Sequence, residues 1–250
     1  MTAVQESARR RLSWDHPELA LAGICGCAWL GLMAFHFASA APATPHGHHH
    51  AAPTQDVAAV STGIVVSVTF WILMAVATML PTALPAARTI GLTGMWSRRH
   101  RGPALFAAGY LAVWIAAGIP LVVAAAWIVP GDPSPLLIAA ALAVAAAWEI
   151  TPWKRWCLRG CHRLRSLPPS GRRADHGCVA LGVRNGLSCT GACWAMMTPM
   201  ALAWHAAGLW VMTVVTATVW AEKLLRNGSR HLPMAAATLA ASAVLVAVTG

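Results

Sequence analysis

The chain has 250 residues, of which 58% are hydrophobic and 10% are charged, and its 18 Lys and Arg against 8 Asp and Glu give a formal net charge of +10. A soluble domain usually carries about 25% charged residues, so this composition excludes disorder, a coiled coil, an ordinary soluble enzyme and a histone-like nucleic-acid binder. It indicates an all-α protein of several membrane-spanning helices, in which the positive charge marks orientation and not a nucleic-acid partner.

Apolar segments recur along the chain, each approaching the roughly 20 residues that a helix needs to cross a bilayer. Seven such segments are present, the fourth and sixth being short: Leu19–Ala40, Ala58–Pro81, Ala104–Val129, Leu136–Thr151, Leu187–Ala206, Leu209–Ala221 and Leu232–Thr249. The connections between them are short. We therefore predict a single integral membrane domain over residues 1–250, built as a transmembrane helical bundle of about seven spans.

The distribution of basic residues predicts how this bundle is oriented. If the N-terminus is cytoplasmic, every Lys and Arg lies on the cytoplasmic side, many of them in the basic loop 153–185, and the His-rich outer loop 41–57 has none. The positive-inside rule then places the C-terminus outside a bacterial cytoplasmic (inner) membrane that the chain crosses several times. The alternative for the first segment is a signal peptide, with Arg9–Arg11 before the apolar run and cleavage after Ala40, which leaves six spans.

Seven cysteines are present, and this layout puts all of them near the cytoplasmic side, which makes a disulfide framework unexpected. The strongest local feature is Cys189 with Cys193, which share a helix face that Met196 and Met197 continue. Thiolates and thioethers together select Cu(I). Gly186 and Gly191 allow another helix to approach closely. The alternative interpretation is a helix interface with buried free thiols and gap-filling methionines.

A second feature is the Cys-x₃-Cys-His sequence at Cys157, Cys161 and His162, on a basic and helical segment. Together with Cys178, these side chains have the donor types of a tetrahedral zinc site. The spacing is not that of paired Cys-x₂-Cys zinc motifs, so zinc is less expected than copper. The alternative is a basic loop at the membrane surface that carries incidental thiols.

A short histidine tract lies in the first outer loop. It contains His46, His48, His49 and His50 within an Ala, Pro and Thr-rich sequence. Imidazole binds copper, zinc and nickel, and short His tracts often collect metal ions. The alternative is a solvated polar loop.

Two carboxylates lie near the inner ends of predicted spans, at Glu149 and Glu222. Acidic groups inside a membrane are costly and by default suggest a functional role. Lys154 and Lys223 are close enough in sequence to pair with them, which is the alternative explanation. Counting along the predicted spans at about 1.5 Å of rise per residue predicts that five side chains lie at a similar depth in the inner third of the membrane. They are Met79, Glu149, Cys189, Cys193 and Glu222.

Five stretches, in this order, resemble a bacterial domain-of-unknown-function family described as predicted metal-binding integral membrane proteins. They are Met79–Pro85, Gly109–Trp114, Thr151–Cys161, Gly182–Met197 and Glu222-Lys223, so the resemblance spans roughly Ala58 to Lys223.

Some members of this family carry a copper-chaperone-like label, so the resemblance implies copper handling. It points to Cys157, Cys161, Cys189 and Cys193 as metal ligands, with Met196, Met197 and Glu222 secondary. Members often have adjacent cysteines in the second motif, whereas here Ala192 precedes Cys193 and one potential ligand is absent.

The absence of any nucleotide-binding, nucleophile-elbow or metalloprotease motif favours a protein that is not an enzyme. We expect it to bind copper and to hand it over, with the lipid bilayer and a metal donor or acceptor protein as partners. Two alternatives remain open: an accessory or structural subunit of a larger membrane metalloenzyme complex, and a small metal transporter.

Overall fold

The computed structural model describes residues 14–40, 57–128, 133–161, 163, 167–168, 170–202, 208–225 and 230–249. Regular structure within these ranges is helical, which confirms the predicted all-α class. In chain order the elements are α2 (Leu19–Ala40), α3 (Val57–Met74), the π-helical turn η1 (Ala75–Met79), α4 (Leu80–Thr93), the 3₁₀ turn η2 (Trp96–Arg98), α5 (Arg101–Ile128), α6 (Pro135–Glu149), α7 (Pro152–Cys161), α8 (Gly171–Leu202), α9 (Gly208–Leu224) and α10 (Leu232–Thr249).

Each of the seven predicted segments overlaps a helix over its described residues, but the helices differ in how well they suit a membrane. In the described part of the chain, four helical segments are long and apolar enough to cross one: 19–37, 63–93, 96–125 and 232–249. The pair α6 and α7 adds a fifth if it forms one span bent by 76°. The layout of seven spans and its orientation therefore stay predictions. The predicted basic loop 153–185 is largely helical, since it contains α7 and the first turns of α8.

The second predicted segment, expected to end at Pro81, continues as helix through η1 to Thr93. Proline has no N–H, so Pro81 leaves the carbonyl of Ala77 without its usual helical donor. The indole N–H of Trp29 donates to this carbonyl at 3.0 Å, and the indole of Trp220 donates to the carbonyl of Thr78 at 2.9 Å. Side chains of neighbouring helices thus satisfy the backbone where the helix is irregular.

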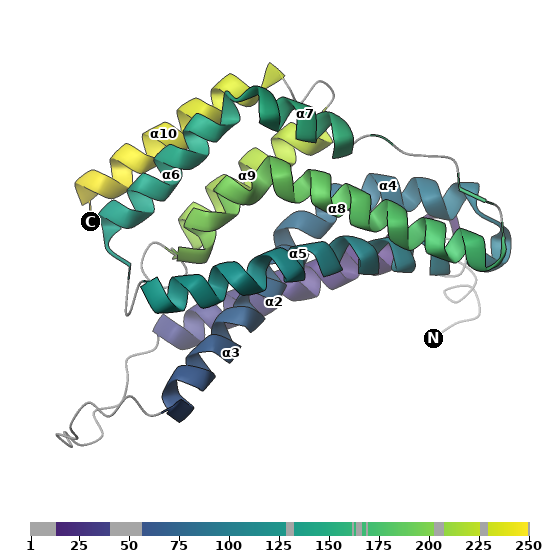
Figure 1. Ribbon diagram of the computed structural model, residues 1–250, viewed down its shortest axis with the longest axis horizontal. Helices are drawn as coiled ribbons and strands as arrows, with labels where there is room; N and C mark the ends of the chain where they lie inside the picture. The colour runs from purple at the N-terminus through teal and green to yellow at the C-terminus, as the bar shows by residue number, and fades with distance from the viewer. Residues whose placement is uncertain are drawn as a thin grey trace, which may run out of the picture.

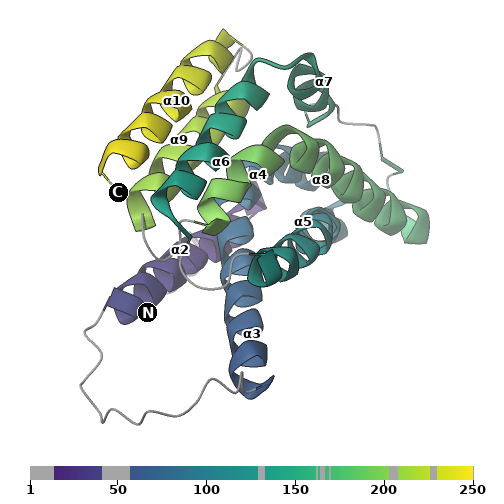
Figure 2. The same ribbon diagram turned by 60° about the vertical axis from the view of Figure 1, so that its left-hand side comes forward.

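Helices α5 and α8 lie side by side, as Figures 1 and 2 show, because glycines bring their backbones together. A Cβ atom on Gly182 would lie 2.1 Å from the carbonyl oxygen of Phe106, and one on Gly109 would lie 2.5 Å from that of Val179. Gly186 meets the same helix, with 3.0 Å from its ideal Cβ to the Tyr110 carbonyl. The predicted close approach at Gly186 is confirmed, and this pair of helices is the frame on which the candidate site is built.

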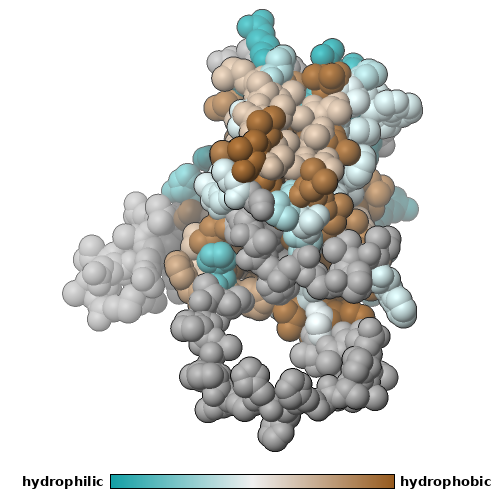
Figure 3. Space-filling view, turned by 90° about the vertical axis from the view of Figure 1, so that its left-hand side faces the viewer, coloured by the Kyte–Doolittle hydropathy of each residue, from teal (hydrophilic) through white to brown (hydrophobic). Residues whose placement is uncertain are grey.

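Helices α6 and α10 form an antiparallel pair at one end of the molecule (Figure 1). Leu142 and Leu239 are buried between the helices, while Val144 and Val248 are exposed. Apolar side chains cover this end of the molecule in Figure 3. An exposed apolar surface of this kind is what a bilayer would cover.

Candidate metal centre

The four cysteines predicted as ligands come from two helices that pack together. Helix α7 carries Cys157 and Cys161, and α8 carries Cys189 and Cys193. A spacing of four residues places each pair on one face of its helix. The site therefore requires α7 to lie against α8 with these two faces toward each other.

Two glycines permit this packing. A Cβ atom on Gly160 of α7 would lie 2.6 Å from Oγ of Ser188, and one on Gly191 of α8 would lie 2.8 Å from Sγ of Cys157. A larger residue at either position would force the Ser188 or Cys157 side chain to move. The close approach predicted at Gly191 is confirmed, and its neighbour is a thiol.

Cys189 is the centre of the thiol cluster. It lies close enough to interact with the thiols of Cys161 and Cys193, and Cys157 lies within electrostatic range of Cys193. Cys189 and Cys193 are buried, with 1% and 0% exposure, whereas Cys157 and Cys161 are partly exposed. Among the described residues, no three His, Cys, Asp or Glu side chains form a ready-made metal-holding group. The structure thus brings the predicted thiols together in pairs.

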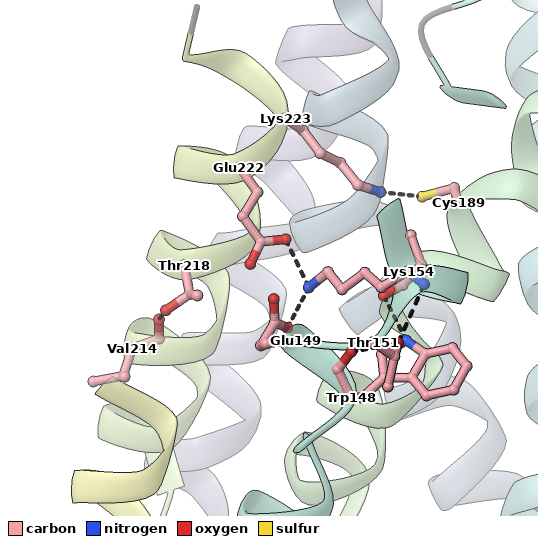
Figure 4. A network of polar contacts seen from close by, with 10 residues as sticks. Trp148, Glu149, Thr151, Lys154, Cys189, Val214, Thr218, Glu222 and Lys223 are labelled. Atoms are coloured by element: carbon pink, nitrogen blue, oxygen red, sulfur yellow. Dashed lines mark hydrogen bonds and ion pairs between the residues drawn. The ribbon is translucent and has the colours of Figure 1, made fainter. Parts of the chain in front are cut away.

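A lysine and a tyrosine contact the central thiol. Nζ of Lys223, on α9, lies 2.5 Å from Sγ of Cys189 (Figure 4), and the ammonium group is also within electrostatic range of Cys161 and Cys193. The hydroxyl of Tyr110, on α5, lies 2.8 Å from the same sulfur and 3.1 Å from the carbonyl oxygen of Met79. Cys189 is therefore held by side chains from two other helices, α5 and α9.

A cavity of about 150 Å³ opens onto this cluster. Both Cys161 and Cys189 line it, so two sulfurs face one space that is large enough for an ion. The remaining lining residues are Thr82, Ala83, Pro85, Ala86, Thr89, Tyr110, Asn185 and Lys223.

The two acidic residues lie in a buried network of ion pairs beside the thiols. Lys154 pairs with Glu149, and its Nζ atom lies 2.8 Å from Oε2 of Glu222, with all three side chains fully buried (Figure 4). The predicted pairing with lysine is thus confirmed for Lys154. Lys223 contacts Cys189 instead. The structure places Glu222 with Lys154 and gives it no contact with a thiol.

The methionines predicted as secondary ligands are buried in the apolar core. Met196 and Met197 each have 0% exposure. Their helical spacing places Met196 and Met197 one turn beyond Cys193 on α8. They are available as thioether donors next to the buried thiol pair.

The zinc set does not assemble among its described members. Cys178 lines a different cavity, of about 320 Å³, and has Arg98 and Asp175 as its charged neighbours. Burial raises the pKa of the Cys178 thiol. His162 and the histidine tract lie outside the described residues. The tract consists of His46, His48, His49 and His50.

Sequence reasoning gave no site role to the two residues that hold Cys189. The chain has two lysines beside sixteen arginines, and it has one tyrosine. Lys223 and Tyr110 both lie in stretches that carry the family resemblance. Their rarity was a usable signal, but nothing in the local sequence indicates that either side chain reaches α8.

The fold and site define a class: a helical protein with several helices apolar enough to cross a membrane, and a cluster of thiols between α7 and α8 of which two are buried. The chain belongs to the PpoB2 family, described as "Copper chaperone", whose family model matches residues 68–246. This match confirms the resemblance and extends it to α10. No curated protein and no solved structure matches the chain. The family description connects the protein with copper.

Proposed function

We propose that this protein is an integral membrane copper chaperone that binds Cu(I) with the thiols of α7 and α8. The observation that carries the proposal is the convergence of Cys161 and Cys189 on one small cavity, with Lys223 beside them. Soft thiolates prefer Cu(I) over harder ions. The copper description of the family supports the same metal.

The proposed ligands differ in how deeply they are buried. Cys157 and Cys161 are partly exposed at the edge of α7, whereas Cys189 and Cys193 are buried. Copper arriving from a donor protein would first meet the α7 thiols and then pass to the α8 pair by exchange of thiolate ligands. Met197 lies one turn further along and extends the set of soft donors. Release to an acceptor protein follows the same steps in reverse.

The membrane arrangement is also part of the proposal. The seven-span layout places the thiols at the cytoplasmic side of a bacterial inner membrane and the His-rich loop 41–57 outside. The histidines would collect ions at the outer surface, and the cysteines would retain Cu(I) at the inner one. Four or up to five helical segments suited to span a membrane, counted over the part of the chain that the structure describes, support the membrane location.

The test is the copper content of the purified protein. The chain is purified without oxygen in detergent, loaded with Cu(I), desalted and analysed for metal and protein. Wild type should retain stoichiometric copper, and the variant C189S/C193S should retain none.

The matched control is C25S/C178S, which also removes two buried thiols, neither of them in the cluster. It should retain copper like wild type. Unchanged copper in C189S/C193S would overturn the proposed ligands, and loss of copper in both variants would show that the thiols act through the fold and not as ligands.

A further inference from the structure

A third cavity, of about 550 Å³, is lined by residues of α7 and α8 and by Arg163. Three arginines line it: Arg159 and Arg163 at the end of α7, and Arg184 on α8. We call this cavity the arginine groove. Three guanidinium groups around one space provide many N–H donors in the planar geometry that matches phosphate.

The charge of the arginine groove is not neutralised by the protein. No carboxylate lines it. In the described ranges, Arg159, Arg163 and Arg184 form no ion pair; the nearest acid on α8, Asp175, is occupied by Arg98 and Arg101. The Nε–H of Arg159 donates to the carbonyl oxygen of Arg155 on its own helix, so this bond does not use the terminal nitrogens. The groove is therefore suited to an anion.

The remainder of the groove is apolar and exposed. Trp156 and Leu187 line it with 66% and 61% exposure, and Trp153, one turn earlier on α7, is equally exposed. On the opposite face of α7, Lys154 and Leu158 are buried. A short helix with buried residues on one face and tryptophan beside arginine on the other is typical of the membrane interface. The groove therefore joins a cationic end to an apolar side at that boundary.

We propose that the arginine groove binds the headgroup of an anionic phospholipid. The phosphate is held by Arg159, Arg163 and Arg184, and the start of an acyl chain lies along Trp156 and Leu187. Basic pockets between helices on the cytoplasmic side are known binding places for such headgroups. A free phosphate shares the anionic chemistry but makes no use of the apolar wall. This inference goes beyond copper binding, because it requires no metal.

The groove also adjoins the thiol cluster, since Cys157 lines it. A lipid seated there contacts both α7 and α8. It would hold the partly exposed thiols of α7 against α8.

The experiment measures lipid retention by native mass spectrometry of the full chain, delipidated in neutral detergent without copper. Phosphatidylglycerol or phosphatidylcholine is titrated into wild type, into R159Q/R163Q/R184Q and into R155Q/R172Q/R173Q. The last variant loses the same charge from exposed positions that do not line the groove. Melting temperatures confirm that all three proteins are folded.

Phosphatidylglycerol should bind wild type and the control with similar affinity and R159Q/R163Q/R184Q at least about tenfold more weakly. Phosphatidylcholine should bind all three weakly. Equal loss in both variants would show that only net charge matters, and equal binding of the two lipids would show that the headgroup is not recognised; either result overturns the proposal. Full displacement by millimolar inorganic phosphate would overturn it too, because it would identify a soluble-anion site. Copper loading is measured separately, so its failure leaves this result intact.

Discussion

Nζ of Lys223 lies 2.5 Å from Sγ of Cys189, so one of the two lysines in the chain has a sulfur as its partner. The residue before it, Glu222, pairs with Lys154. Consecutive residues of a helix point about 100° apart. One turn of α9 therefore contributes a side chain to each of two neighbouring polar clusters, the thiols and the ion-pair network.

Replacing Lys223 should weaken copper binding without removing a ligand. We expect K223M to bind Cu(I) about 10 to 100-fold more weakly, as is usual when a group that contacts a metal ligand is lost. K223R keeps the positive charge and should retain more of the affinity. Competition with a colorimetric Cu(I) chelator measures both. Equal affinities of K223M and wild type would exclude a role for the ammonium group.

Removing the lysine from the ion-pair network should destabilise the protein. K154M leaves Glu149 and Glu222 buried without a counter-charge, and loss of one partner from a buried ion pair costs about 3–5 kcal/mol. E149Q/K154M/E222Q removes all three charges and should recover most of the loss. Thermal unfolding in detergent, followed by circular dichroism, gives the comparison. A triple variant no more stable than K154M would contradict this account.

Packing of α5 against α8 should depend on the absence of a side chain at Gly182. G182A would place Cβ 2.1 Å from the carbonyl oxygen of Phe106, so the helices must separate. We expect a loss of about 1–3 kcal/mol and a lower unfolding temperature. The control is G23A, whose Cβ would meet nothing within 4 Å. Equal behaviour of the two variants would contradict the tight contact.

Membrane orientation can be tested with reporter fusions. Alkaline phosphatase, which is active only outside the inner membrane, should be active when fused after Thr249 and inactive when fused after Arg163. A cytoplasmic fluorescent reporter should give the opposite pattern. Activity of both phosphatase fusions would contradict a cytoplasmic loop 153–185, and activity of neither would contradict an odd number of spans with a cytoplasmic N-terminus.

Much of the fold could be predicted because a long apolar run is a local sequence signal of a membrane-spanning helix. Long apolar runs located all seven helical segments, and four-residue spacing placed the cysteines of each pair on one face. The exception is the end of the second segment. Pro81 suggested a helix end, but the side chain of Trp29, about fifty residues earlier, satisfies the carbonyl that the proline leaves free.

The contacts within the site could not be predicted, because they join helices that are distant in sequence. Both lysines lie near an acid in sequence, yet only Lys154 pairs with one. The choice depends on which helix packs opposite each side chain, and that is decided by glycine contacts between distant segments, such as Gly191 with Cys157. A single sequence shows which residues are present, but it does not indicate which of them contact each other.

The position of Lys223 has a consequence for which ion the cavity accepts. In the proposed site, two metal-binding thiolates and the ammonium group of Lys223 would together carry one net negative charge. A monovalent cuprous ion brings this buried group to neutrality, whereas a divalent zinc ion leaves it with an excess positive charge in a medium that stabilises charge poorly. The lysine would thus discriminate between metals by valence, without touching the ion itself.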